Sequence, residues 1–145
     1  MKYASIVPLI GGATIAMQNV LQREPEYIIS YDDFKANDNH LVEYYKGTVP
    51  YYLYGDNGTP DLPSVEVINT VCPCAGLSSL SPTASSDAAA NDWMLTTADF
   101  VLGTLKPQVF WGENAPGLAS NIGRPVVRKL RKIAESCGYT FSIYK

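Results

Sequence analysis

The chain has 145 residues, of which 46% are hydrophobic and 17% are charged, with a formal net charge of −3 and a pI near 5.0. This size and balance are typical of one globular domain, and the acidic pI argues against a general affinity for nucleic acid. The three cysteines, an odd number, do not form a disulfide framework, which favours a reducing compartment. The sequence shows no membrane-spanning run and no signal-peptide layout. We therefore expect an intracellular, cytoplasmic protein with no membrane partner.

Strand-like and helix-like stretches alternate along the chain, which predicts an α/β fold with a parallel sheet and helices on both faces. The expected elements, in chain order, are strand 3–9, a helix between Gly12 and Pro25, strand 27–31, helix 34–45, strand 49–54, strand 65–71, helix 92–105, strand 108–112, a helix from Arg124 or Pro125 to Cys137, and a sixth strand over 139–144. In the first helix, apolar residues at 13, 16, 17, 20 and 21 predict the face that packs on the core.

The most informative motif is Cys72-Pro73-Cys74, which opens a long loop directly after the apolar run 65–71. A thiol at the end of a buried strand, on a turn stiffened by Pro73 and loosened by Gly76, is where an α/β enzyme places a nucleophile. Buried packing is the alternative for a cysteine. The only other candidate zinc ligands of these types are one distant cysteine and His40, so the ligand spacing of a zinc site is missing and no metal is predicted. A redox pair is also disfavoured, because one residue separates Cys72 from Cys74 where such pairs usually have two.

Two other turns could serve a nucleotide-like cofactor. Gly11-Gly12 follows the first strand and opens a helix, which suits either close approach of a ligand to the backbone or a simple tight turn. Asp32 and Asp33 end the second strand, where a carboxylate either accepts ribose hydroxyls or caps a helix. Asp56 ends the third strand and either accepts from an adenine amino group or folds an Asp-Asn-Gly turn.

A carboxylate and an amide, Glu113 and Asn114, follow the fifth strand. Together they suit the amidine-like edge of a base, although a polar turn is equally open.

A basic cluster lies in the last predicted helix. Five of the eleven Lys and Arg residues fall within nine positions: Arg124, Arg128, Lys129, Arg131 and Lys132. We expect a solvated helix face, and a phosphate-facing surface is the alternative.

The order of these parts resembles the DNA cytosine-5 methyltransferases. Pro73-Cys74-Ala75-Gly76-Leu77-Ser78 is similar to that family's Pro-Cys loop after strand four, and Glu113-Asn114-Ala115 to its Glu-Asn-Val after strand five. Gly11-Gly12 stands in the place of the first cofactor-loop glycines, and Gly55-Asp56 looks like the third cofactor motif. The resemblance spans nearly the whole chain.

The resemblance implies a Rossmann-like S-adenosylmethionine-dependent methyltransferase sheet, truncated after about six strands, in a single partial catalytic domain over 1–145. It implies double-stranded DNA as the partner and a prokaryotic or phage-encoded enzyme. It also implies S-adenosyl-L-methionine as the cofactor, bound by Ile10, Gly11, Gly12, Asp32, Asp56 and Pro73.

The mechanism that the resemblance implies acts on a flipped-out cytosine. The Cys74 thiolate adds to C6, Glu113 holds and protonates N3, and C5 then takes the methyl group before loss of the C5 proton expels Cys74. Asn114 is expected to orient the loop that carries Cys74.

The chain also departs from the family. Leu9 stands where a glycine is usual, and Tyr31 stands where the ribose-binding glutamate is expected. The later Gln-x-Arg-x-Arg motif, the target-recognition domain and the terminal cofactor helix are absent from this sequence, so we expect a second chain or a C-terminal segment to supply target recognition. Two alternatives stay open: a degenerate, non-catalytic module that binds cofactor or a partner, and another kind of thiol enzyme that uses Cys72 and Cys74.

Overall fold

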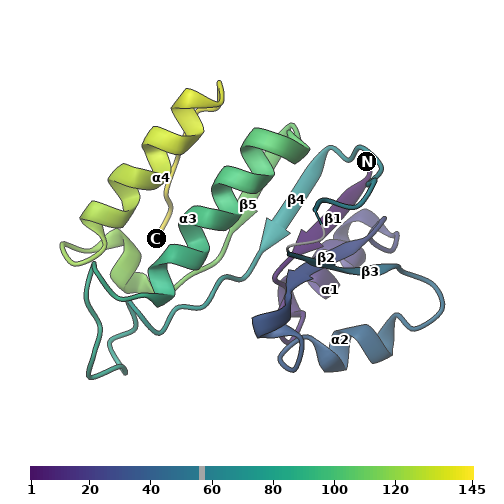
Figure 1. Ribbon diagram of the computed structural model, residues 1–145, viewed down its shortest axis with the longest axis horizontal. Helices are drawn as coiled ribbons and strands as arrows, with labels where there is room; N and C mark the ends of the chain where they lie inside the picture. The colour runs from purple at the N-terminus through teal and green to yellow at the C-terminus, as the bar shows by residue number, and fades with distance from the viewer. Residues whose placement is uncertain (56–57) are drawn as a thin grey trace. The chain divides into compact units, whose positions relative to one another are not determined.

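The computed structural model describes residues 1–55 and 58–145 (Figure 1). Contacts within the chain define two compact units. The first unit comprises Met1–Val71 and Pro107–Gly112, and the second comprises Cys72–Lys106 and Glu113–Lys145.

The first unit is built on a five-stranded parallel sheet in the order β3-β2-β1-β4-β5. Its strands are β1 (Tyr3–Ile6), β2 (Ile28–Tyr31), β3 (Tyr51–Tyr54), β4 (Val67–Thr70) and β5 (Val109–Gly112). Every residue of β1, β2 and β4 is buried, whereas the edge strands β3 and β5 are partly exposed. Continuous apolar runs are typical of parallel strands covered on both faces. The predicted α/β class and parallel sheet are confirmed, and the topology is compatible with a Rossmann-like fold.

The strand order reverses between β1 and β4. The chain passes from β1 through β2 to β3 at one edge, and then from β4 to β5 at the other. Beyond the paired strands, the Val71 N–H donates to the Val7 carbonyl at 3.2 Å, which holds the carboxyl ends of β1 and β4 side by side. In open parallel sheets, ligands bind at such a reversal, outside the carboxyl ends of the strands.

Two helices and a short turn complete the first unit: α1 (Gly12–Leu21), the 3₁₀ turn η1 (Asp32–Phe34) and α2 (Asn39–Tyr44). Ile28, Leu41 and Tyr45 form a buried cluster against which Ile15 and Tyr51 pack, so α1 and α2 share a core with β2 and β3.

The face that α1 buries differs from the predicted one. Val20 is 78% exposed, and Thr14 is buried instead. The Thr14 hydroxyl donates to Ser5 Oγ at 2.8 Å, and the Ser5 hydroxyl donates to Asn69 Oδ1 at 2.7 Å. Buried polar groups need such partners, so this hydrogen-bonded chain, rather than the apolar stripe, sets the rotation of α1 about its axis.

The second unit contains α3 (Ala90–Phe100), its continuation as a π-helical turn η2 (Val101–Leu105), the 3₁₀ turn η3 (Pro116–Ala119) and α4 (Arg124–Ser136). In Figure 1, α3 and α4 run alongside each other, and they are in contact. Apolar residues form the buried side of each of these helices: Met94, Ala98, Val101 and Leu102 are buried in α3 and η2, and Val126, Leu130 and Ala134 are buried in α4.

The prediction of a sixth strand over 139–144 is wrong, because this segment pairs with no described strand. The Tyr139 N–H donates instead to the Ala134 carbonyl at 2.9 Å, and the Arg131 guanidinium lies 5.2 Å from the centroid of the Phe141 ring. The segment thus folds back along α4. A strand exists only through hydrogen bonds to a neighbour, and apolar composition alone does not supply one.

Candidate functional site

The loop between β1 and α1 has an unusual backbone. Val7, Leu9 and Gly11 have φ of 49°, 52° and 93°, in the left-handed region that favours glycine. A Cβ at Gly11 would lie 2.5 Å from Leu41 Cδ1. The glycine at 11 is therefore required by the backbone and by packing against α2, whatever the loop binds.

Ile10 and Gly12 face open surroundings in the same loop. The Ile10 side chain is 76% exposed, and a Cβ at Gly12 would meet no atom of the described residues within 4 Å. Gly12 begins α1, whose N-terminus has no side-chain cap from the residues that the structure describes. Since the first N–H groups of a helix have no partner within it, this end of α1 offers donors to a polar group of a ligand.

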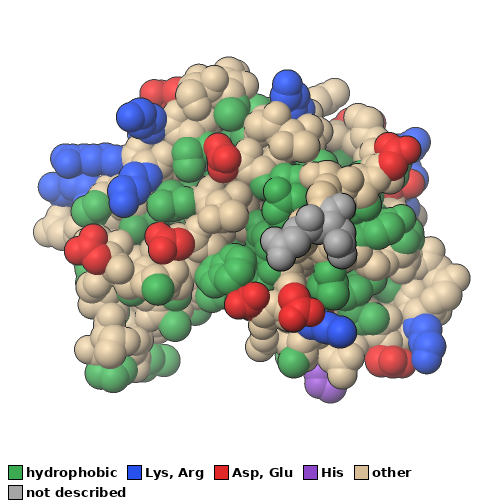
Figure 2. Space-filling view, in the orientation of Figure 1, with side chains coloured by type: hydrophobic (Ala, Val, Ile, Leu, Met, Phe, Trp, Pro, Cys, Tyr) green, Lys and Arg blue, Asp and Glu red, His purple; other side chains and the backbone are tan. Residues whose placement is uncertain are grey.

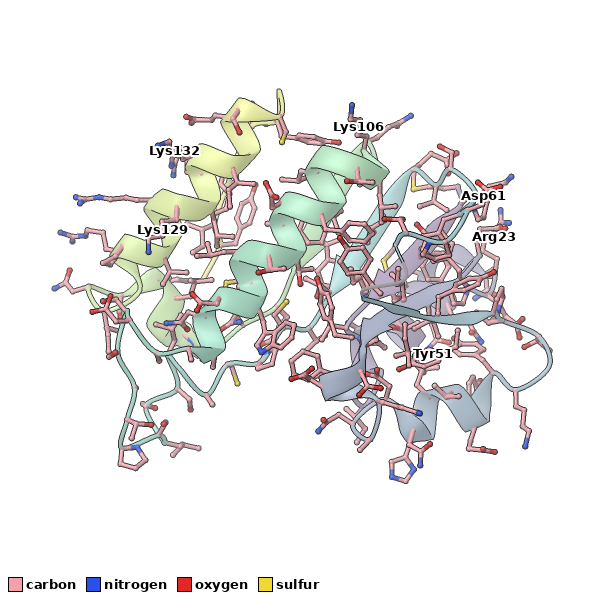
Figure 3. All side chains as sticks on the ribbon, viewed as in Figure 1. Arg23, Tyr51, Asp61, Lys106, Lys129 and Lys132 are labelled. Atoms are coloured by element: carbon pink, nitrogen blue, oxygen red, sulfur yellow. The ribbon has the colours of Figure 1, made fainter. Side chains whose placement is uncertain are left out.

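Asp38 fixes this loop, and sequence reasoning missed it. Its side chain is fully buried, Oδ1 accepts the Leu9 N–H at 3.0 Å, and Oδ2 accepts the Tyr51 hydroxyl at 2.6 Å. Figure 3 shows Tyr51 between the sheet and α2. Burial raises the pKa of Asp38, and hydrogen bonds to the carboxylate oppose that rise. In the sequence, Asn37-Asp38-Asn39 is indistinguishable from a polar turn.

At the carboxyl end of β2, Asp32 is exposed and Tyr31 is buried. The Tyr31 ring packs edge-on against Phe34 and Tyr54, with centroid separations of 6.3 and 5.9 Å. Asp32 lies in the first turn of η1, which none of the described side chains caps. The Asp32 carboxylate therefore does not serve as the helix cap and faces solvent. Asp56 lies outside the described residues.

The described residues of the first unit fit the predicted cofactor in chemistry. The Asp32 carboxylate suits ribose hydroxyls, the Ile10 side chain offers an apolar surface, and the α1 N-terminus around Gly12 suits a carboxylate.

In the second unit, Cys74 starts a tight turn. Its carbonyl accepts the N–H groups of Leu77 and Ser78 at 3.0 and 2.9 Å. Leu77 is 2% exposed and anchors the turn, whereas Cys74 is exposed. The local structure thus presents the Cys74 thiol to solvent from an ordered backbone.

The long loop after Cys74 is held by the start of α3. Asn91 Nδ2 donates to the carbonyls of Ser85 and Ser86 at 2.9 and 3.2 Å, and the Ser85 N–H donates to the Gly76 carbonyl at 2.9 Å. A Cβ at Gly76 would collide with Asn91 Oδ1. Glycine at 76 therefore lets the Cys74 turn pack closely on Asn91.

Asn114 links the segment after β5 to the cysteine motif. Its Nδ2 donates to the Cys72 carbonyl at 3.3 Å, while its Oδ1 accepts the Ala115 N–H at 2.9 Å. A Cβ at Gly117 would collide with the Leu77 carbonyl, so the two segments are in close contact. An amide that holds the backbone two residues before Cys74 has the geometry that a positioning role requires.

Of the remaining predicted residues, Glu113 is exposed and Pro73 is half-buried. Among the described residues, no hydrogen bond joins Glu113 to Cys74. The three cysteines, all within the described residues, form no disulfide. Cys72 is 2% exposed and its Sγ lies 3.9 Å from the Trp93 carbonyl oxygen, whereas Cys137 is half-buried.

In the part of the chain that the structure describes, no cluster of three or more His, Cys, Asp or Glu side chains could hold a metal ion. No helix over the same residues has the length and apolarity to cross a membrane. In comparisons with known proteins, no family model matches the chain, and no curated protein matches it.

Proposed function

We propose that the chain is the catalytic part of a DNA cytosine-5 methyltransferase, which methylates C5 of cytosine through a covalent cysteine adduct. The observation that carries the proposal is the 3.3 Å hydrogen bond from Asn114 Nδ2 to the Cys72 carbonyl. It joins the two motifs that such chemistry needs, one with an exposed thiol and the other with an exposed carboxyl group, Glu113.

The cofactor would be held in the first unit. The α1 N-terminus at Gly12, the Ile10 side chain and the Asp32 carboxylate are the groups that would bind S-adenosylmethionine. This cofactor supplies an electrophilic methyl group when bound. The reversal of strand order between β1 and β4 supports this location, because parallel sheets bind nucleotides there.

The residues of the second unit would act on the base. The Cys74 thiolate forms a bond to C6, and the electron pair of the C5–C6 double bond moves to the C4–C5 bond. The C4–N3 pair in turn moves to N3, which takes a proton from the Glu113 carboxyl group. C5 becomes nucleophilic and would take the methyl group that the bound cofactor supplies, the cofactor sulfur keeping the electron pair of the broken S–CH3 bond. N3 then returns its proton to the Glu113 carboxylate. A base then removes the C5 proton, the double bond reforms and the C6–sulfur bond breaks, which returns the electron pair to Cys74. Asn114 keeps the Cys74 turn in place.

The first test measures cofactor binding by calorimetric titration of the full chain with S-adenosylmethionine. We expect saturable binding that is weakened at least tenfold in Asp32→Ala. Asp33→Ala is the matched control, because it removes the neighbouring exposed carboxylate, and it should bind as the wild type does. Absence of binding to a folded chain would contradict the proposal.

The second test traps the covalent intermediate. Duplex DNA that contains 5-fluorocytosine is incubated with the chain and S-adenosylmethionine, since fluorine at C5 cannot leave as a proton does and the adduct persists. Intact-mass analysis should find a protein–DNA adduct that Cys74→Ala abolishes and that Cys137→Ala leaves unchanged.

A non-catalytic module that binds cofactor or a partner is the second candidate. Leu9 favours it: the residue is half-buried with φ of 52° in the cofactor loop, where a side chain is strained and glycine is usual in the family that the chain resembles. Cofactor binding without any trapped adduct would support this candidate over the enzyme.

A further inference from the structure

One face of α4 concentrates positive charge. The helix carries five of the chain's eleven Lys and Arg residues but, with Glu135, only one of its fourteen Asp and Glu residues. Figure 2 shows basic side chains gathered over α4, and Figure 3 shows Lys132 directed away from α3. All five basic side chains are exposed: Arg124, Arg128, Lys129, Arg131 and Lys132. This set is the basic face of α4.

The positive charges of this face repel each other. Arg128 lies four residues from both Arg124 and Lys132, and like charges at this spacing destabilise a helix. The first turn of α4 has no acidic residue, so the cation there also faces the positive end of the helix dipole.

Over 1–55 and 58–145, the interactions of the basic face are with uncharged groups. Arg124 donates to Asn121 Oδ1 at 2.7 Å, and Arg131 stacks on Phe141. Arg128, Lys129 and Lys132 form no ion pair with any residue that the structure describes. An ordinary solvated helix face mixes positive and negative side chains. A face with positive charge alone destabilises the helix, so we interpret it as a surface that binds an external anion.

The apolar side of α4 excludes a membrane as the favoured partner. An amphipathic helix that lies in a bilayer surface inserts its apolar face among the lipids. In α4 that face consists of Val126, Leu130 and Ala134, which are buried at 2%, 8% and 4% exposure in a unit where α4 packs against α3. The apolar face of α4 is therefore already covered within the protein and is not free to insert into a bilayer.

We propose that the basic face of α4 binds the phosphate backbone of a nucleic acid without reading its sequence. From Arg124 to Lys132 the helix rises roughly 12 Å, a length over which duplex DNA carries about seven phosphate charges. The inference extends the proposed function by giving its nucleic-acid partner a second contact surface. It does not require methyl transfer, because neither cofactor nor thiol takes part.

The test is fluorescence anisotropy of the full chain with a labelled 20-base-pair duplex of arbitrary sequence, without cofactor, from 50 to 200 mM salt. In the test variant, Arg128, Lys129 and Lys132 are each replaced by Gln. Because this variant cannot neutralise three of the phosphates, the slope of log affinity against log salt should become less negative by about 3, with affinity at least roughly tenfold lower at 50 mM salt.

The matched control replaces three exposed lysines of the first unit, Lys2, Lys35 and Lys46, by Gln, which changes net charge equally. It should keep the wild-type slope; equal losses of affinity in both triple variants would overturn the proposal, as would absence of binding by the wild type. Stronger binding to anionic lipid vesicles than to the duplex would also overturn it. Cys74→Ala should bind DNA normally, so failure of methyl transfer and failure of this surface are distinguishable.

The stability of the same variant is an independent check. Removal of like-charge repulsion should leave the urea midpoint equal to or above that of the wild type. A lower midpoint would contradict the argument that these cations oppose the helix, and any loss of DNA binding would then report unfolding.

Discussion

The carboxylate of Asp38 accepts the backbone N–H of Leu9, 29 residues earlier in the chain, at 3.0 Å. The bond ties the loop after β1 to the start of α2 at a point where the Leu9 backbone is left-handed. The other carboxylate oxygen accepts the Tyr51 hydroxyl from β3 at 2.6 Å. One buried side chain thus holds the loop that is proposed to bind the cofactor.

We predict that Asp38→Ala destabilises the protein by about 2–4 kcal/mol, because it leaves the partly buried Tyr51 hydroxyl and the Leu9 N–H without their acceptor. Tyr51→Phe removes one hydroxyl and should cost about 1 kcal/mol. Urea unfolding of the two single variants and the double variant measures the coupling between the side chains. If the effects of the two substitutions simply add, Asp38 and Tyr51 do not cooperate in holding the loop.

Asp38 should also give the stability a characteristic pH dependence. Burial raises its folded-state pKa, so over the interval above the unfolded value of about 4 the folded protein keeps a proton that the unfolded chain has lost. Stability relative to Asp38→Asn should therefore be highest below pH 4 and fall as the pH rises through the folded-state pKa.

Urea unfolding of the wild type and Asp38→Asn between pH 3.5 and 7 measures this difference. Glu66, whose pKa is lowered by the Lys2 N–H, makes an opposite contribution, but it is present in both proteins and cancels on subtraction. A stability difference that does not change with pH would contradict the prediction.

Local patterns predicted the sheet, because the strands of a buried parallel sheet are short stretches rich in apolar and β-branched residues. Val67–Thr70, for example, is buried throughout and was recognisable without its neighbours. The prediction of a sixth strand was wrong because a strand also needs a neighbour: 139–144 has strand-like composition, but no described strand lies beside it to pair with. The face of α1 could not be read from apolar spacing, since it depends on the hydrogen bond between Thr14 and Ser5.

The candidate site was predictable to a similar degree. The exposed Cys74 and the Gly11 turn carry local signals in proline and glycine. Asp38 carries none, because its role depends on Leu9 and Tyr51, which only the fold brings to it. The catalytic roles of Cys74 and Glu113 stay predictions.

The two glycines of the loop between β1 and α1 should respond oppositely to alanine. Gly11→Ala must adopt φ of 93° and place its Cβ against Leu41, so we expect a loss of about 2–4 kcal/mol. Gly12→Ala meets open space in the first turn of α1 and should be neutral or stabilise by up to about 1 kcal/mol. Urea unfolding measures both variants. Equal destabilisation would mean that the loop is not built around the Gly11 conformation.

Asn114 should restrain the cysteine motif through a single donor. Asn114→Asp keeps the oxygen that accepts the Ala115 N–H but lacks the Nδ2 donor to the Cys72 carbonyl. We expect the variant to fold, with a destabilisation of about 1 kcal/mol, and amide hydrogen exchange in 72–78 to accelerate severalfold. Glu113→Gln is the matched neighbour and should leave that exchange unchanged. Unaltered protection in Asn114→Asp would mean that the bond does not hold the Cys74 turn.

The thiols should react with iodoacetamide in a fixed order. Cys74 is exposed on an ordered turn, Cys137 is half-buried at the end of α4, and Cys72 is 2% exposed. Since alkylation requires access to the sulfur, Cys74 should be labelled fastest, and Cys72 at least roughly tenfold more slowly, as followed by peptide mass analysis over time. In Cys74→Ser, the fastest label should move to Cys137. Equal rates at Cys72 and Cys74 would favour a thiol enzyme that uses both sulfurs, because covalent attack on a base needs only one exposed thiolate.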